Sequence, residues 1–342
     1  MIATTPTDIL RFVLARTGEG VRTILVTLTA IEGSSPRAVG AQMAVAEVGR
    51  YVGSFSGGCI EAAVVAEAIG TLADGRAKLV RLGAGSPYLD IRLPCGGGID
   101  LLFHPHPDPH AVAEALAQHS RREMAVLRLS DDGVSSDTWV ADADVAGWQD
   151  GRFRCLYPPT LRLVAMGQGE ELVALARLAA SFGADVSVFS PDERALADLD
   201  AEGFDTVRLT ARTVLPAVST DPWTAILSIF HDRDWEEDLL PRALRLPCFY
   251  IGAIGSRRTQ DDRLAALREA GVPEILRRKL RTSVGLIPAT RDPATLALSV
   301  LSQIVQEYHR IGGMPVEPDD AASSGRDDYA KSGDLMGQTL RA

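Results

Sequence analysis

The strongest constraint on the fold of this chain is an uninterrupted series of strand, turn, helix and strand in its second half. Residues 161–166 form an apolar run of strand length, and Gly167-Gln168-Gly169 follows as a tight turn. Residues 170–182 have the apolar spacing of a helix, which ends at the next glycine, and residues 185–189 are predicted to form a second strand. This pattern predicts a βαβ unit, whose two strands lie parallel in one sheet.

Further patterns extend that unit to a larger sheet. Strands are predicted at 225–230 and 248–254, each followed by a helical stretch, and a closing helix at 292–309. Strands and helices in this order favour a Rossmann-like, doubly wound parallel sheet. The first half also alternates, from a strand at 21–30 to one at 124–129, so the predicted fold class is α/β throughout.

The length of 342 residues exceeds one ordinary domain and suffices for two separate cores. Tyr157-Pro158-Pro159 forms a stiff break between the two patterns. We therefore expect an N-terminal α/β domain at 1–157 and a Rossmann-like C-terminal domain at 158–312. The segment 313–342 is rich in Pro, Asp, Ser and Gly and is expected to be a disordered tail.

Composition excludes several classes of function. A net charge of −10 argues against sequence-independent binding of nucleic acid, which requires a basic surface. No apolar run reaches the length that spans a membrane, and the first residues do not resemble a signal peptide, so a cytoplasmic location is expected. The cysteines contain no C-x-x-C pair, which argues against a disulfide scaffold or a zinc knuckle. They are Cys59, Cys95, Cys155 and Cys248.

Two of these cysteines are flanked by glycine. Cys59 follows Gly57-Gly58 and precedes a helical pattern, and Cys95 precedes Gly96-Gly97. Backbone N–H groups at the start of a helix favour a thiolate, the form that binds soft metals or carries sulfur. Flanking glycines let a bulky cofactor approach backbone N–H groups, which can also hold phosphate. The alternatives are that both thiols are small core residues beside tight turns, or that they form a redox-active disulfide.

The turn of the βαβ unit begins like a dinucleotide fingerprint but does not complete it. Gly167 and Gly169 match the first two glycines, whereas Leu172 replaces the third small residue. Two glutamates directly follow Gly169, where a pyrophosphate would meet the helix dipole. The acidic residue expected after the second strand is displaced, since Asp192 lies two positions further on. The turn therefore predicts the fold and disfavours NAD(P).

Two other segments follow predicted strands of the same sheet, at the edge where ligands bind in such folds. His231-Asp232 could supply an acid, a base or a ligand, or could belong to an acidic surface loop with residues 234–238. The segment 252–258 opens a helix and offers an anion site, or else a solvated turn. Its candidate ligand-binding residues are Gly255, Ser256, Arg257 and Arg258.

Two charged runs have simpler interpretations. Prolines alternate with His104, His106 and His110, which favours a rigid connector over a metal site. Arg277-Arg278-Lys279 with Arg281 is typical of a solvated helix end, although it could bind an acidic partner.

Taken together, the motifs resemble the XdhC/CoxI family, accessory factors for molybdenum hydroxylases such as xanthine and aldehyde dehydrogenases. The resemblance runs from about Val21 to Tyr308. In the first half it rests on Gly33-Ser34-Ser35-Pro36-Arg37, Gly57-Gly58-Cys59 with Glu61, and Pro94-Cys95-Gly96-Gly97. In the second half it rests on Gly167-x-Gly169, His231-Asp232 and the run from Tyr250 to Thr259.

The resemblance implies a chaperone that binds molybdenum cofactor, supports exchange of an oxo for a sulfido ligand with a cysteine desulfurase, and delivers the cofactor to an apo-hydroxylase. Cys59 and Cys95 would contact molybdenum or carry the sulfur, and residues 255–258 would hold a phosphate. The cofactor would be molybdopterin or its cytosine dinucleotide form, and such chaperones are often homodimers. The other candidate cofactor-binding residues are Gly57, Gly58, Gly96, Gly97, Gly167, Gly169, His231 and Asp232.

The chain departs from the family pattern in its second half, at Glu170, Glu171, Leu172, Ser190, Phe230 and Arg233. These changes disfavour a catalytic role, so we assign no catalytic residue and expect a non-enzymatic chaperone. The rival hypothesis is an NAD(P)-dependent oxidoreductase that uses His231 as acid or base.

Overall fold

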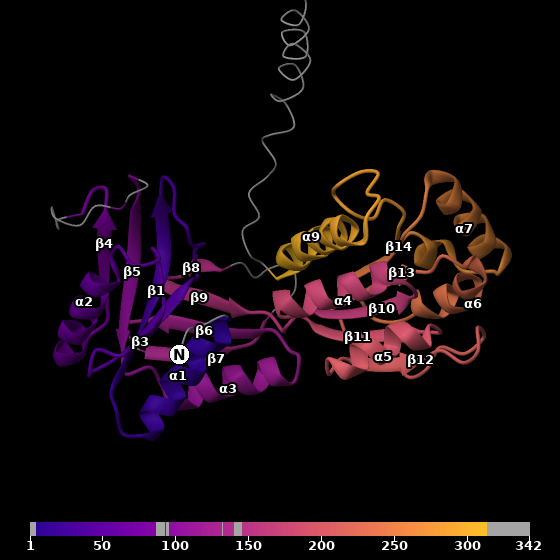
Figure 1. Ribbon diagram of the computed structural model, residues 1–342. Helices are drawn as coiled ribbons and strands as arrows, with labels where there is room; N and C mark the ends of the chain where they lie inside the picture. The colour runs from indigo at the N-terminus through magenta and orange to yellow at the C-terminus, as the bar shows by residue number, and fades with distance from the viewer. Residues whose placement is uncertain (1–4, 87–92, 94–95, 132, 140–145, 313–342) are drawn as a thin grey trace, which may run out of the picture.

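The computed structural model describes residues 5–86, 93, 96–131, 133–139 and 146–312. Within them the chain forms three sheets arranged in two lobes (Figure 1). Two antiparallel sheets and three helices make the first lobe, and a parallel sheet covered by helices makes the second. The predicted α/β class and the parallel sheet of the second half are confirmed.

The first sheet has the strand order β3-β2-β1-β5-β4, and every neighbouring pair is antiparallel. Its strands are β1 (Thr23–Glu32), β2 (Gln42–Ala46), β3 (Tyr51–Gly53), β4 (Lys78–Gly83) and β5 (Gly98–Pro105). Apolar side chains of α2 (Glu61–Asp74) cover one face of this sheet. The opposite face packs on α1 (Pro6–Gly18), α3 (Pro109–Ser120) and the second sheet.

The second sheet is a four-stranded antiparallel sheet in the order β7-β6-β9-β8. Its strands are β6 (Ala125–Ser130), β7 (Gly133–Asp137), β8 (Gly147–Gln149) and β9 (Arg152–Tyr157). Alternate residues of β6 face opposite sides, because successive side chains of a strand do so. Leu127 therefore packs in the first lobe, whereas Val126 packs against the second.

The parallel sheet has the order β12-β11-β10-β13-β14-β15, with the topological switch point between β10 and β13. Its strands are β10 (Arg162–Gly167), β11 (Asp185–Ser190), β12 (Asp205–Arg208), β13 (Thr224–Ile229), β14 (Tyr250–Ala253) and β15 (Leu280–Arg281). The helices are α4 (Glu170–Phe182), α5 (Glu193–Ala201), α6 (Arg233–Ala243), α7 (Arg257–Glu269), α8 (Glu274–Arg277) and α9 (Pro293–Ile311).

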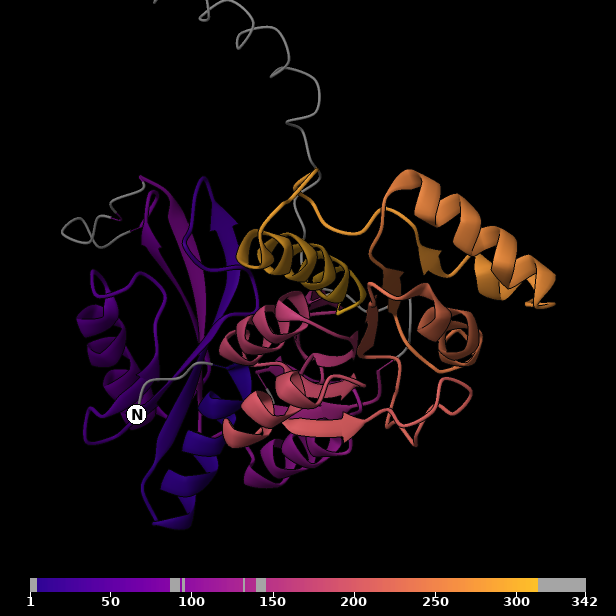
Figure 2. The same ribbon diagram turned by 45° about the vertical axis from the view of Figure 1, so that its right-hand side comes forward.

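Both faces of this sheet are buried, which explains why its central strands are apolar without alternation. Leu163 and Ala165 of β10 pack with α4, α5 and α9, whereas Val164 and Met166 pack with α6 and α7. Figure 2 shows α4 and α9 on the opposite side of the sheet from α6. This arrangement leaves the carboxyl ends of the strands free to form a site.

The lobes are joined by polar and aromatic contacts as well as by apolar packing. Trp139 and Trp223 lie with their ring centroids 6.0 Å apart, and Arg122 forms an ion pair with Asp221. The hydroxyl of Tyr308 on α9 donates to the carbonyl oxygen of Pro159, in the segment between the lobes (2.7 Å). These contacts lie between the two sheets that meet there.

Two sequence interpretations need correction. Residues 6–18 form the helix α1, which the sequence analysis did not predict; Pro6 begins it, and a capping box joins Thr5 and Asp8. Residues 234–238 belong to α6 rather than to an acidic loop, because Leu239 and Leu240 anchor an apolar face on the sheet. The predicted tail at 313–342 lies outside the described residues.

Candidate functional site

Three loops that carry the motifs of the first half leave the antiparallel sheet in the same direction. They follow β1, follow β3 and precede β5, and in an antiparallel sheet these strand ends lie on one side. The loops comprise residues 33–41, 54–60 and 84–97, of which 87–92, 94 and 95 are not described. The fold thus places the Cys59 loop and the Gly96-Gly97 turn on either side of the 33–41 loop.

The loop that carries Cys59 is organised around the carboxylate of Glu61, the first residue of α2. Six groups donate hydrogen bonds to it at 2.8 to 3.3 Å: the hydroxyls of Ser54 and Ser56 and the N–H groups of Phe55, Ser56, Gly58 and Ile60. Glu61 is only 3% exposed. Burial raises the pKa of this carboxyl, but the hydrogen bonds outweigh that effect and lower the pKa to about 2.

The remaining amides of the loop are also bonded within it. The N–H of Gly57 donates to Ser54 Oγ (2.9 Å), and the N–H of Cys59 donates to Ser56 Oγ (3.0 Å). Gly57 and Gly58 have φ values of +76° and +126°, which favour glycine. This corrects the expectation of a free phosphate cradle, since the loop uses these amides to hold its own shape. What it presents to solvent is the exposed thiol of Cys59.

The neighbouring loop contacts both cysteine motifs. Arg37 Nε donates to the carbonyl oxygen of Ser54 (3.1 Å), at the start of the Cys59 loop. A Cβ atom on Gly97 would lie 2.6 Å from Glu32 O and 2.8 Å from Ser34 O, so glycine is required there. The segment between Ser34 and Arg37 therefore links the two motifs. Cys95 itself lies outside the described residues.

The second group of candidates lies at the carboxyl edge of the parallel sheet. Gly167 ends β10, and a Cβ atom there would lie 2.3 Å from the carbonyl oxygen of Ile229 on β13. Its missing side chain therefore permits close strand packing rather than approach of a ligand. Gly169 has φ +84° and precedes α4, so it forms the turn that the fingerprint predicts.

Carboxylates occupy the part of this turn that a pyrophosphate would use. Glu171 Oε2 lies 3.2 Å from His231 Nε2, so the unexpected glutamate pairs with the predicted histidine. Asp192 Oδ2 lies 3.4 Å from the N–H of Gly169, and Asp192 Oδ1 caps α5. Two negative side chains at the start of α4 oppose binding of a diphosphate there.

Of the other predicted residues at this edge, two cap helices and two are exposed arginines without an ion-pair partner among the described residues. Asp232 caps α6 by accepting from the N–H of Asp234 (3.1 Å), and Ser256 caps α7 by accepting from the N–H of Thr259 (3.2 Å). Arg257 and Arg258 are exposed, and no residue in the described part of the chain pairs with either guanidinium.

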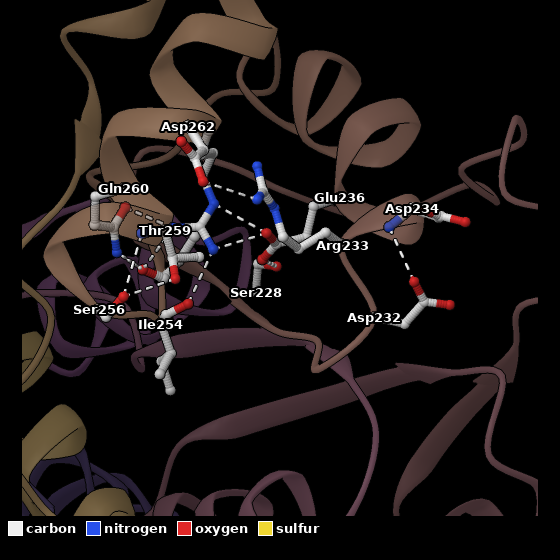
Figure 3. Close-up of polar contacts among 12 residues, drawn as sticks. Ser228, Asp232, Arg233, Asp234, Glu236, Ile254, Ser256, Thr259, Gln260 and Asp262 are labelled. Atoms are coloured by element: carbon white, nitrogen blue, oxygen red, sulfur yellow. Dashed lines mark hydrogen bonds and ion pairs between the residues drawn. The ribbon is translucent and has the colours of Figure 1, made fainter.

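A buried network below the Gly255-Ser256 turn was not predicted from the sequence (Figure 3). Glu236 and Arg263 are each 4% exposed, and Glu236 Oε2 accepts from Arg263 Nε (2.9 Å) and Nη2 (2.7 Å). Ser228 donates to Glu236 Oε1 (2.6 Å), and Arg263 Nη2 also donates to the carbonyl oxygen of Ile254 (2.9 Å). The network joins β13, α6 and α7 and holds the turn after β14 in place.

A cavity of about 680 Å³ lies above these strand ends. It is lined by the start of α4, the ends of β13 and β14, and residues 283–290, which we call the strap. Two partly buried hydrogen bonds tie the strap to α9, since the N–H of Gly285 donates to Gln303 Oε1 (2.9 Å) and that of Ile287 to Ser299 Oγ (2.7 Å). This is a ligand-sized cavity at the switch point of the sheet.

The two remaining motifs carry no comparable arrangement. His104 is buried, its Nε2–H donates to the carbonyl oxygen of Ser130 (3.0 Å), and burial lowers the pKa of its imidazole. Within the described ranges, no group of three or more His, Cys, Asp or Glu residues could hold a metal ion. In the basic run, Arg278 pairs with Glu274 and Arg281 with Glu307.

Comparison with known proteins matches both halves of the chain. The family model of the XdhC and CoxI family matches residues 17–83, and that of the XdhC Rossmann domain matches residues 163–304. A protein from Escherichia coli K12 named molybdenum cofactor insertion chaperone PaoD is 36% identical over 296 residues, which cover 86% of each chain. The chain belongs to the XdhC and CoxI family.

More distant relatives in the XdhC and CoxI family extend the match. A Bacillus subtilis protein, named as one of the probable subunits of xanthine dehydrogenase, is 23% identical over 325 residues, covering 84% of this chain and 94% of that protein. A solved structure, titled a xanthine dehydrogenase from Bacillus halodurans, superposes with a TM-score of 0.68 at 20% identity. The superposition covers 90% of this chain and 96% of the Bacillus halodurans chain, which confirms the fold.

For this XdhC and CoxI family member, sequence motifs located both regions but missed the residues that build them. Glu61 was visible only as part of a motif, and its role emerges once Ser54 and Ser56 surround it. The sequence pattern placed Glu236 in an acidic surface loop and did not single out Arg263. The sequence signal for the burial of Glu236 was the helical spacing that places it on the same face as Leu239 and Leu240.

Among the described residues, no helix is both long and apolar enough to cross a membrane.

Proposed function

We propose that this chain binds molybdenum cofactor as a cargo, supports its sulfuration and delivers it to a molybdenum hydroxylase of the xanthine or aldehyde dehydrogenase type. The observation that carries the proposal is the Cys59 loop, which presents an exposed thiol on a backbone held rigid by Glu61. Similarity to PaoD over most of both chains supports it. A thiolate is the form of cysteine that ligates metals or carries sulfur.

The cargo site would combine groups from the three loops of the first lobe. Cys59 would contact molybdenum or carry the transferable sulfur, and Cys95 would be the second thiol with that role. Gly57, Gly58, Gly96 and Gly97 would leave room for the bulky cofactor beside the thiols. Because the amides near Cys59 are already bonded, a phosphate would need donors outside these three loops, and the exposed Arg257 and Arg258 at the start of α7, in the second lobe, would bind it there.

The partners follow from this cargo. A cysteine desulfurase would supply the sulfur, and an apo-hydroxylase would accept the loaded cofactor, in its mononucleotide or cytosine dinucleotide form. The chain would act by binding and release, as a monomer or a homodimer in the cytoplasm. The rival oxidoreductase is disfavoured because Glu171 and Asp192 lie where the diphosphate of NAD(P) would bind.

The test is to express the chain in a host that makes molybdenum cofactor, purify it without oxygen, and measure molybdenum and oxidised pterin per protomer. Wild type should carry both, and Cys59→Ala and Cys95→Ala should each carry much less. Cys248→Ala is the matched control, since that half-buried thiol lies in the other lobe and should leave the cargo unchanged.

Delivery is tested by mixing loaded protein with an apo-hydroxylase and following the recovery of its activity. Wild type should restore activity, and Cys59→Ala should not. Empty wild-type protein that instead binds a nicotinamide dinucleotide, with binding lost in Gly169→Asp, would overturn the proposal in favour of the oxidoreductase.

A further inference from the structure

The cavity above the parallel sheet has a chemistry that differs from that of a dinucleotide site. Among the described residues, its titratable lining side chains are Glu171 and His231, and neither arginine nor lysine lines it. An anion inside would meet the Glu171 carboxylate with no lining arginine or lysine to compensate. The cavity therefore favours a neutral group that donates hydrogen bonds.

The walls favour a flat ring. Ile229, Phe230 and Ile254 line the cavity from the strand ends, and Val284 and Leu296 line it from the strap and α9. A planar heterocycle buries both of its apolar faces between such walls, while its edge stays available for hydrogen bonds. The volume of about 680 Å³ accommodates a ring system with a sugar or a second ring.

Glu171 is placed to recognise the edge of such a ring. Its side chain is 26% exposed, and its Oε2 lies 3.2 Å from His231 Nε2, a contact that fixes the orientation of the carboxylate. The second carboxylate oxygen of Glu171, Oε1, has no hydrogen-bond partner in the described part of the chain. A carboxylate accepts from two adjacent N–H groups, which the amino group and ring N–H of a pterin provide, or from a single amino group, as a cytosine provides.

The position of the free cations agrees with this assignment. Arg257 and Arg258 begin α7 directly after Gly255 and Ser256, which line the cavity, but the two arginines do not line it themselves. A ligand with its ring inside would therefore carry its phosphate toward the arginines and away from the carboxylates of Glu171 and Asp192. This is the reverse of the usual arrangement, in which the first turn holds the phosphate.

From these observations we infer that the cavity binds the amino-bearing edge of a planar nitrogen heterocycle, with Glu171 as acceptor and His231 as its positioning residue. The inference rests on the proposed function, because the cargo would supply the ring. Both a pterin and a cytosine present an exocyclic amino group that donates to a carboxylate, which is the chemistry they share; a pterin adds a neighbouring ring N–H, whereas the neighbouring N3 of cytosine is an acceptor.

The experiment measures binding of free rings to the full-length protein by calorimetry. Two matched pairs serve as probes: pterin against lumazine, and cytidine against uridine, since within each pair an amino group is replaced by a carbonyl. The amino-bearing member of one pair should bind at least about tenfold more tightly than its partner. Preference within the pterin pair or within the cytidine pair identifies which ring of the cargo enters.

Variants test the role of the carboxylate. Glu171→Gln should reduce binding of the amino-bearing ring about tenfold or more and narrow its advantage over the carbonyl ring. Glu170→Gln is the matched control, because that residue is exposed on the same helical turn and does not line the cavity. His231→Ala should weaken binding less, and restoring a side-chain N–H donor with His231→Gln should recover part of it.

The inference is overturned if neither pair binds, if amino and carbonyl rings bind equally, or if Glu171→Gln binds like wild type. These results are distinct from failure of the proposed function. Protein that carries molybdenum and pterin but ignores free rings refutes the cavity assignment alone. Protein that selects amino-bearing rings but never carries molybdenum refutes the chaperone role and leaves the cavity chemistry standing.

Discussion

The two candidate regions use buried carboxylates in opposite ways. In the first lobe, Glu61 collects hydrogen bonds from its own loop and leaves one thiol exposed. In the second lobe, Glu236 pairs with Arg263 below the surface, and the carboxylate of Glu171 remains at the edge of a cavity. The comparison teaches that one carboxylate shapes the loop that presents an exposed thiol, whereas the others support and border a cavity.

The largest effect is expected from breaking the buried pair of the second lobe. Arg263→Ala leaves the Glu236 carboxylate buried without its partner and should lower the free energy of unfolding by about 3–5 kcal/mol. Urea unfolding measures this loss. Arg257→Ala, on the same helix but exposed, should change stability by less than about 0.5 kcal/mol. Equal small losses for both variants would show that the network does not support this lobe.

The corresponding change in the first lobe is predicted to depend on pH. The pKa of Glu61 lies at about 2, below its ordinary value of 4.5, so ionisation stabilises the fold. The contribution is about 3 kcal/mol above pH 4.5 and is lost as pH falls from 4.5 toward 2. Glu61→Gln should therefore be less stable than wild type near neutral pH, and the difference should shrink at about pH 3.

Urea unfolding at both pH values checks this prediction. Asp74→Asn provides the control, since this exposed residue lies at the other end of the same helix and should shift stability by less than about 0.5 kcal/mol. A stability difference between wild type and Glu61→Gln that stays constant down to pH 3 would contradict the role assigned to the carboxylate.

A smaller effect separates a glycine that the site requires from one that it does not. Gly169→Ala places a side chain at φ +84° and close to Glu171 and His231, which should cost about 1–2 kcal/mol. Gly70→Ala lies inside α2 with no atom within 4 Å of the new methyl group, so it should add about 0.5–1 kcal/mol. Thermal unfolding of both variants should therefore show shifts of opposite sign, and a shared sign would contradict the assignment.

The last test compares the reactivity of two thiols in the folded wild-type protein and involves no change in stability. Cys59 is exposed, whereas Cys155 is fully buried and its burial raises the pKa of the thiol to about 12. Alkylation of the folded protein, followed by peptide mass spectrometry, should label Cys59 rapidly and Cys155 only after unfolding. Comparable labelling of both cysteines in folded protein would contradict the difference in solvent exposure between Cys59 and Cys155.

Sequence patterns predicted the parallel sheet because fully apolar strands, glycine turns and amphipathic helices are local signals. They failed where a residue's role depends on distant neighbours. Asp234 and Glu236 look alike in the sequence, yet the first is exposed and the second is buried against Arg263, which lies 27 positions further on. Helix α1 was missed because its apolar residues are buried by packing against α3 and the sheet, which are distant in sequence.

By itself, therefore, the sequence determined the Rossmann-like second half, much of the order of strands and helices, though not α1, and the positions of the cysteine and glycine motifs. Each of these follows from residue spacing along a single segment. Only the tertiary structure decided that Glu61 occupies the amides of the Cys59 loop, and that Glu171 meets His231 beside a cavity closed by the strap. Hydrogen bonds and cavities depend on distances between segments, which no local pattern specifies.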